Sequence, residues 1–220
     1  MPETALLSLL HLLVLVYWLG GDLGAFYTSR YLILPGVSAD RRLMAAKIVG
    51  DVDMAPRTAL ILALPTGLAL ARASGWLTIA DWAMTLIVIA AAAWVALVWR
   101  LHVAHGNAPA WMRTIDLIAR VLLLAGLVAL ASAGLAGQFA LPHFLALKLY
   151  LLAACVALGL WIRRVLVPLG PALAGLSGED SARHEADLAR TLRRARPLVV
   201  AIWGLILTAA LVGLWKPTIT

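Results

Sequence analysis

The chain has 220 residues, of which 63% are hydrophobic and 13% are charged, and its formal net charge is +7. A soluble domain of this size cannot bury so much apolar surface, which excludes a water-soluble globule and makes a lipid bilayer the solvent for most of the chain. The positive charge does not indicate nucleic-acid binding, because the cationic residues gather between apolar stretches, as the positive-inside rule predicts. The single cysteine, Cys155, excludes an intramolecular disulfide and a cysteine-rich metal site.

Six apolar stretches follow one another along the chain, and each reaches the roughly 20 residues that a membrane-spanning helix needs once its flanks are included. The first residues lack the basic segment of a secretory signal, so we expect the first stretch to be retained as a helix. A longer stretch is divided by residues that end and begin helices, namely Gly134, Gly137, Gln138 and Pro142. The sequence predicts an all-α membrane bundle, one domain over residues 1–220, with spans at about 5–34, 54–73, 79–101, 115–136, 143–166 and 197–215.

The distribution of basic residues predicts the orientation of this bundle. If the N-terminus lies outside, fifteen lysines and arginines fall at or near the cytoplasmic face, and only Arg72, Lys148 and Lys216 remain for the other half. Both termini are therefore expected on the non-cytoplasmic, periplasmic side of a bacterial inner membrane. The one long connection, about 175–196, is rich in Ala, Leu and Arg, and we expect a cytoplasmic helix there that leads into the sixth span.

Polar residues inside membrane spans are costly unless they are paired or functional, and the first span holds several. His11 and Asp22 are eleven residues apart, close to three helical turns, so both should project from one stripe, with Asp22 about 16 Å deeper. Trp18 lies on the same stripe, which we expect to face the bundle interior. Gly20 and Gly24 adjoin it and allow either close packing of a second helix or a groove for a flat cofactor.

A second polar group opens the fifth span, where Pro142 precedes His143 and Lys148. The topology brings His143 to the membrane level of His11, and two histidines at one depth could ligate a haem b iron or a copper ion. The alternative is that His143 is an interfacial residue without a ligand. Lys148 follows five residues later, roughly 140 degrees around the helix, so it should lie on another face. It could pair with a carboxylate such as a porphyrin propionate, or extend to the outer headgroups.

Three histidines fall on the cytoplasmic side. His102 and His105 are three residues apart and could chelate a metal if helical, but the neighbouring glycine and proline favour a loop without a ligand role. His184 is expected on a surface helix.

Several short motifs, in the same order along the chain, resemble those of the HemJ-type protoporphyrinogen oxidases. The chain looks like a divergent relative of that family. The motifs are His11-x6-Trp18, Phe26-Tyr27-x-x-Arg30, Asp40-Arg41-Arg42-Leu43-Met44, Met54-x-Pro56, Gly67, Lys148 and Trp215-Lys216-Pro217. The resemblance implies a membrane oxidoreductase or electron-transfer protein that binds haem b.

The same resemblance implies roles for individual residues. His11 would be an axial ligand of the haem in a site that includes Trp18, and His143 is the candidate for the second ligand. Arg30 and Lys148 would neutralise porphyrin propionates or pair internally, and Asp22 would serve proton movement coupled to electron transfer. A lipid-soluble quinone is the implied electron acceptor, and protoporphyrinogen IX is the substrate if the reaction of the family is retained.

Two alternatives come from other classes. Trp18-Leu19-Gly20-Gly21 after an outer histidine resembles the copper resistance protein D (CopD) family, which implies copper uptake or handling with His11 and His143 at the entry site. The third reading is a non-catalytic partner subunit of a membrane complex or homo-oligomer, whose polar stripe only packs helices.

Overall fold

The computed structural model describes residues 2–104, 106–178 and 180–216, so His105 lies outside the described residues. Within these ranges most of the chain is helical and no strand is present, which confirms the predicted all-α class. Six helical segments are long and apolar enough to cross a membrane. The elements are α1 (Pro2–Thr28), η1 (Ser29–Leu32), α2 (Ala39–Val52), α3 (Met54–Ala73), α4 (Asp81–Val103), α5 (Ala110–Leu135), α6 (His143–Val165), α7 (Leu169–Ala174), η2 (Gly175–Ser177) and α8 (Ser181–Trp215).

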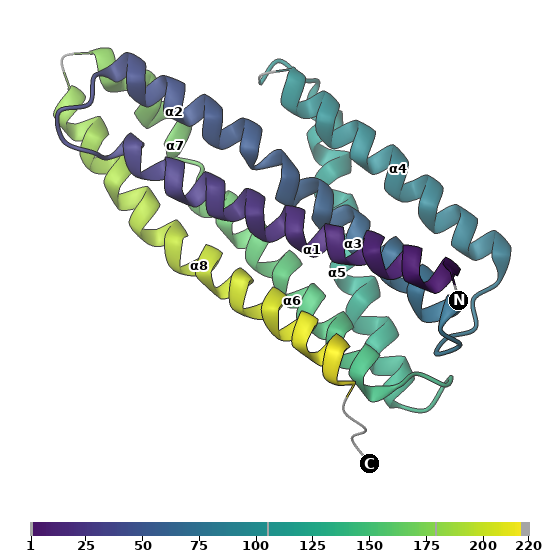
Figure 1. The fold of residues 1–220 in the computed structure, drawn as a ribbon. Coiled ribbons are helices and arrows are strands. Elements are labelled where there is room, and N and C mark those ends of the chain that lie inside the picture. The colour runs from purple at the N-terminus through teal and green to yellow at the C-terminus, as the bar shows by residue number, and fades with distance from the viewer. Residues whose placement is uncertain (1, 105, 179, 217–220) are drawn as a thin grey trace.

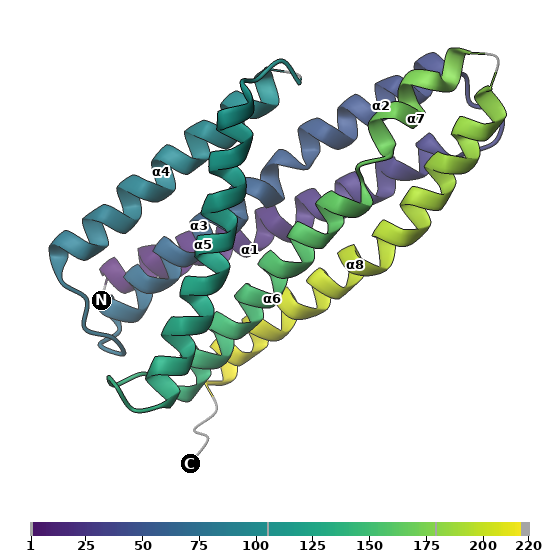
Figure 2. The same ribbon diagram turned by 180° about the vertical axis from the view of Figure 1, so that it is seen from behind.

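The six long helices form a ring in which each contacts the next. The neighbouring pairs are α1 and α3, α3 and α4, α4 and α5, α5 and α6, α6 and α8, and α8 and α1. The start of α1 and the end of α8 lie at the same end of the bundle, as six crossings require (Figure 1). We call this the terminal end. Figure 2 shows from behind that the turn between α5 and α6 also lies at the terminal end, while α2 and α7 lie at the opposite end.

Three of the six segments have 35 residues, more than the bilayer requires. His143–Ser177 comprises α6 and the short helices α7 and η2. The other two are nearly continuous helices: α2 and α3 form Ala39–Ala73, and α8 continues through Pro197. At 1.5 Å per residue each is about 50 Å long, against a hydrocarbon core of about 30 Å. The sequence predicted the α3 part as a span but left α2 as a connection. The helix expected around 175–196 is present as the first part of α8.

A buried arginine joins α2, η1 and α8 at the end opposite the termini, beside two small hydrophobic clusters. Arg42 of α2 is only 3% exposed and forms an ion pair with Glu185 of α8 at 3.1 Å. Its guanidinium also donates hydrogen bonds to the carbonyl oxygens of Leu32, Leu34 and Val37, which follow the end of α1. The guanidinium group of arginine is planar and carries five N–H donors. One side chain can therefore bond to several backbone carbonyl oxygens that have no partner within a helix.

A second buried ionic cluster joins α4, α5 and α6. Asp116 is 1% exposed and accepts hydrogen bonds from Nε1 of Trp94 at 2.9 Å and from Nε of Arg120 at 3.2 Å. Nη2 of Arg163 lies 2.8 Å from the same carboxylate. A buried charge of this kind persists only when it is paired and hydrogen-bonded, so the cluster fixes how these three helices meet.

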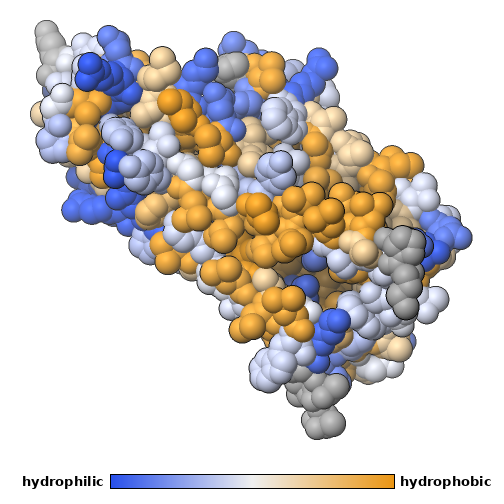
Figure 3. All heavy atoms as spheres, viewed as in Figure 1, coloured by the Kyte–Doolittle hydropathy of each residue, from blue (hydrophilic) through white to orange (hydrophobic). Residues whose placement is uncertain are grey.

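The surface agrees with a membrane-spanning bundle. Figure 3 shows a broad hydrophobic band across the middle of one face, with hydrophilic residues gathered towards both ends. Large apolar side chains are exposed on α1, α4, α5, α6 and α8, where lipid replaces a protein partner, whereas those of α3 are buried or half-buried. The chain is thus a multi-pass α-helical membrane protein.

Candidate functional site

The bundle contains an open cavity of about 470 Å³ near the terminal end, lined mainly by residues of α1, α3, α6 and α8 and of the connection after α3. Its walls are mostly leucine and alanine, and its polar lining consists of two serines, His11, Lys148 and Lys216, together with the rings of Trp18 and Trp76. Helices α1 and α8 diverge on the side where this cavity lies (Figure 1). A concave, mainly apolar cavity with a few convergent polar groups is the usual form of a small-molecule site.

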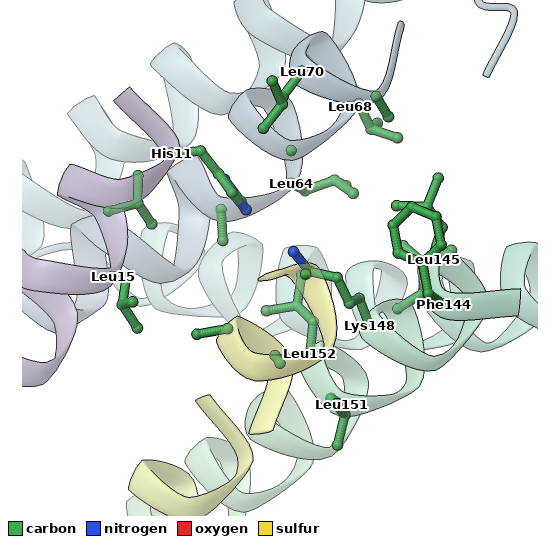
Figure 4. A pocket seen from close by; sticks show the side chains of 18 of the residues that line it. His11, Leu15, Leu64, Leu68, Leu70, Phe144, Leu145, Lys148, Leu151 and Leu152 are labelled. Atoms are coloured by element: carbon green, nitrogen blue, oxygen red, sulfur yellow. The ribbon is translucent and has the colours of Figure 1, made fainter. Parts of the chain in front are cut away.

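His11 is held in one orientation by Thr66. Its Nδ1 lies 2.9 Å from Oγ1 of Thr66, and that hydroxyl donates its own proton to the carbonyl oxygen of Leu62 at 2.7 Å. Because the hydroxyl has only one proton to give, it must accept from Nδ1–H of His11. Nε2 of His11 therefore carries the lone pair. Figure 4 shows a ring nitrogen of His11 and Nζ of Lys148 pointing towards one another across the cavity.

Gly67 makes room for the imidazole ring. A Cβ atom added at this position would lie 3.2 Å from Cε1 and 3.7 Å from Nε2 of His11, so any side chain there would crowd the ring. Thr66 and Gly67 are adjacent on α3, so two successive residues orient His11 and keep its free nitrogen accessible.

Lys148 enters the cavity from α6 and has no ion pair with any residue that the structure describes. No aspartate or glutamate is among the residues that line the cavity. The head of the side chain lies against α8, where a Cβ atom added at Gly213 would be 2.7 Å from Nζ of Lys148. Lys148 is half-buried, and a cation in an apolar cavity without a protein carboxylate is costly, which suggests that the anion comes from a ligand.

Three residues from three different segments form the mouth of the cavity at the terminal end. The rings of Trp76 and Phe144 meet edge to face, with centroids 5.2 Å apart. Nζ of Lys216 lies over the ring of Trp76, 4.8 Å from its centroid. A second ammonium group is thus held at the entrance by a cation–π contact.

Trp18 and Cys155 line the inner part of the cavity, and Trp18 is 6% exposed. Asp22 lies one turn further along α1, beside Trp18 and Trp203, and is not among the residues that line the cavity. Of the polar stripe predicted on α1, the structure therefore brings His11 and Trp18 into the cavity and leaves Asp22 behind the indole of Trp18. Of the predicted pair of glycines, Gly24 serves packing, because a Cβ atom there would meet Val52 of α2, whereas a Cβ atom at Gly20 meets nothing within 4 Å. Gly21 also serves packing, against Ala55 and Pro56 of α3.

His143 and His11 are not brought together. His143 is exposed and is absent from the cavity lining, whereas Lys148 of the same helix lines it. The two residues lie on different faces of α6, as their five-residue spacing predicts. This placement leaves His143 without support as a second ligand of a site at His11.

The remaining candidates also lie outside the cavity. Arg30 is exposed in η1 and donates hydrogen bonds to the hydroxyl groups of Tyr27 and Tyr31, so it does not reach Lys148 or His11. Nε2 of His102 lies 3.0 Å from Oδ1 of Asp51, away from the cavity. The described part of the chain contains no group of three or more His, Cys, Asp or Glu residues that could hold a metal ion.

Sequence reasoning missed Thr66 and Trp76, and gave Gly67, Gly213 and Lys216 no role in a site. A threonine inside an apolar span is an ordinary residue until its partner is known. Lys216 carried a usable signal, because it is one of only three basic residues predicted outside the cytoplasmic half, and Lys148 is another.

Comparisons with protein-family models, with curated proteins and with solved structures found no match for this chain. The class that the fold defines is a six-span helical membrane protein with an internal cavity, and its function must be argued from that cavity.

Proposed function

We propose that the chain is a haem b-binding oxidoreductase or electron-transfer protein of a bacterial inner membrane, with His11 as the axial ligand. The observation that carries the proposal is the Nδ1 hydrogen bond of His11 to Thr66, which leaves Nε2 unprotonated at a cavity. Histidine ligands of metals generally donate their other N–H to an oxygen in this way, which fixes the tautomer and the ring.

The cavity suits a haem in size and in polarity. Its 470 Å³ falls in the range of about 300–1,000 Å³ that is common for ligand pockets, and its walls are apolar. Lys148 supplies the positive charge that a porphyrin propionate needs. Haem b, when bound, supplies one-electron redox chemistry. His11 and Lys148 would hold the group, the leucine walls would limit its contact with water, and Asp22, beside Trp18, would serve proton movement.

The reaction partners follow from this assignment. A lipid-soluble quinone is the proposed electron acceptor, since it can reach the protein from the bilayer. Protoporphyrinogen IX is the proposed substrate if the activity of HemJ-type enzymes is retained. Copper handling is the weaker candidate, because one imidazole suffices for a haem, whereas a copper site needs further ligands that the described cavity does not bring to His11.

An absorption spectrum tests the proposal. Protein purified from haem-supplemented cells should show a Soret band and a sharp reduced α band, and His11→Ala should lose both. His143→Ala is the matched control, since this histidine is exposed outside the cavity, and it should keep the spectrum. An unchanged spectrum in His11→Ala would overturn the ligand assignment. A colourless protein with stoichiometric copper would favour copper handling, and one with neither cofactor would favour a partner subunit.

A further inference from the structure

Two arginines without a carboxylate partner meet where the end of α1 lies beside α8 (Figure 1). Arg30 follows the end of α1, and Arg196 reaches the same turn from α8. Neither forms an ion pair with a residue that the structure describes. The sequence has no aspartate or glutamate between Asp22 and Asp40 or after Asp187. Two cations beside one turn without a counter-charge repel each other, which favours an anion from outside the chain.

Arg30 is exposed and is held in place by two tyrosines. Its Nη2 donates a hydrogen bond to the hydroxyl group of Tyr27 and another, of 3.0 Å, to the hydroxyl group of Tyr31. Its guanidinium carbon also lies 3.8 Å from the centroid of the Tyr27 ring, a cation–π contact. The hydrogen bonds to the described residues use Nη2 alone, so Nε and Nη1 are left for a ligand. Each tyrosine hydroxyl also keeps its own proton to donate.

Arg196 is half-buried, and its contacts with the protein are weak. Its Nη2 lies 3.5 Å from Oγ of Ser29, and its guanidinium carbon lies 5.3 Å from the centroid of the Phe26 ring. Phe26 is fixed in turn by an edge-to-face contact with Trp203, with centroids 5.1 Å apart. Nε of Arg196 is buried and has no hydrogen-bond partner among the described residues. Hydrogen bonds within the protein therefore do not account for the position of this charge.

Both arginines lie where the apolar surface of their helices ends. Residues 197–215 of α8 carry no charge, and neither do residues 23–29 before Arg30. Leu23 and Val200, on the terminal side of the two arginines, are exposed, as residues that face lipid are. The guanidinium groups therefore lie at the level of the lipid headgroups, next to the region of the acyl chains.

We propose that this junction binds an anionic phospholipid, with its phosphate between the guanidinium groups of Arg30 and Arg196 and its acyl chains along the exposed apolar surface of α1 and α8. Guanidinium groups match phosphate oxygens in geometry and in charge. A zwitterionic lipid carries its own cation, so two arginines without an acidic neighbour prefer a lipid with a net negative charge. The bound lipid bridges α1 and α8, the two helices whose contact closes the ring. The site lies at the end opposite the cavity, and the proposal does not rest on haem or on His11.

Native mass spectrometry of the full chain in detergent tests the proposal, because it resolves each bound lipid. Phosphatidylglycerol and phosphatidylcholine with the same acyl chains are added separately, and the affinity for the first bound lipid is measured. The wild type should bind phosphatidylglycerol at least about tenfold more tightly. Arg30→Gln and Arg196→Gln should each weaken its binding about fivefold, the usual contribution of one cation near an anionic lipid surface, and leave phosphatidylcholine binding unchanged.

Arg194→Gln is the matched control. Arg194 is exposed on the same helix at nearly the same level, but it lies two residues from Arg196 and thus about 200 degrees around the helix. This variant should keep the wild-type affinity. Arg30 is exposed, so Arg30→Gln decides the case if Arg196→Gln fails to fold.

Three results would overturn the proposal. They are equal affinities of the wild type for the two lipids, a loss in Arg194→Gln equal to that in Arg30→Gln, and displacement of phosphatidylglycerol by millimolar inorganic phosphate, which would make a soluble phosphate the ligand. The haem spectrum is a separate readout that Arg30→Gln should leave unchanged. A wild-type protein without haem that still prefers phosphatidylglycerol would refute only the proposed function.

Discussion

The imidazole of His11 and the hydroxyl group of Thr66 are joined by a 2.9 Å hydrogen bond whose direction is fixed by the carbonyl oxygen of Leu62. Helix α3 therefore sets the tautomer of a residue on α1. The two helices pack closely along their length, and glycines at their contact allow this approach. The chemistry available at Nε2 thus depends on helix packing as much as on His11 itself.

Replacing Thr66 with valine removes the acceptor and keeps the shape of the side chain. The tautomer of His11 should no longer be fixed, and haem affinity should fall about 10–100-fold, as is typical when the partner of a metal-bound histidine is lost. Nitrogen-15 NMR of histidine-labelled protein measures the tautomer without haem, and titration measures the affinity. Thr208→Val serves as the control, because its exposed hydroxyl bonds to the carbonyl of Gly204. Identical His11 signals in Thr66→Val and wild type would contradict the assignment.

Gly67 should be intolerant of any side chain. Leucine at this position places a branched chain where the His11 ring lies, and we expect haem to be lost from the purified protein, whereas alanine should retain part of it. The ratio of Soret to protein absorbance is the measurement. Gly126→Leu on α5, where an added Cβ atom meets nothing within 4 Å, should keep the wild-type ratio. Full haem content in Gly67→Leu would show that the ring does not bind where we place it.

Asp116→Asn should destabilise the bundle strongly, because it leaves Arg120 buried beside Arg163 without a counter-charge. Breaking a buried pair in this way costs about 3–5 kcal/mol. Unfolding of the detergent-solubilised protein measures the loss. Asp187→Asn removes the exposed pair with Arg190 and should cost at most about 1 kcal/mol. Equal stability of the two variants would mean that the cluster does not hold α4, α5 and α6 together.

The orientation of the bundle remains a prediction that cysteine labelling can test, since the only native cysteine, Cys155, is buried. A membrane-impermeant maleimide added to intact spheroplasts should label Thr78→Cys and Ala140→Cys, which lie in connections at the terminal end. Ser38→Cys and Asn107→Cys, at the opposite end, should react only after the membrane is opened. The reverse pattern would place both termini in the cytoplasm.

Much of the architecture could be predicted because the bilayer imposes a simple rule of length and apolarity on each span. The same rule marked Lys148 as unusual, because charged residues inside a span are rare. Helical periodicity placed Lys148 on a different face of α6 from His143, five residues earlier. The rule of length and apolarity could not identify α2. A helix exposed to water carries charged residues, and a hydropathy profile does not distinguish such a helix from a loop. Asp53 joins α2 to α3 in the right-handed helical region of the backbone, so the charge marks no break.

The site was less predictable because it depends on contacts between distant segments. Thr66 and His11 are 55 residues apart, and nothing local marks the threonine as a partner. The pairing of His11 with His143 rested on equal depth in the membrane, but depth does not fix the direction in which a side chain points. Asp116 and Arg120 had a local signal, since they are four residues apart inside a span and could pair along one helix face.

The length of α8 connects the two sides of the membrane mechanically. Glu185, paired with Arg42, and Gly213, packed on Lys148, belong to one uninterrupted helix and lie about 40 Å apart at 1.5 Å per residue. The Arg42 anchor and the wall of the cavity at Gly213 therefore belong to the same rigid element, so one helix supports both ends of the bundle.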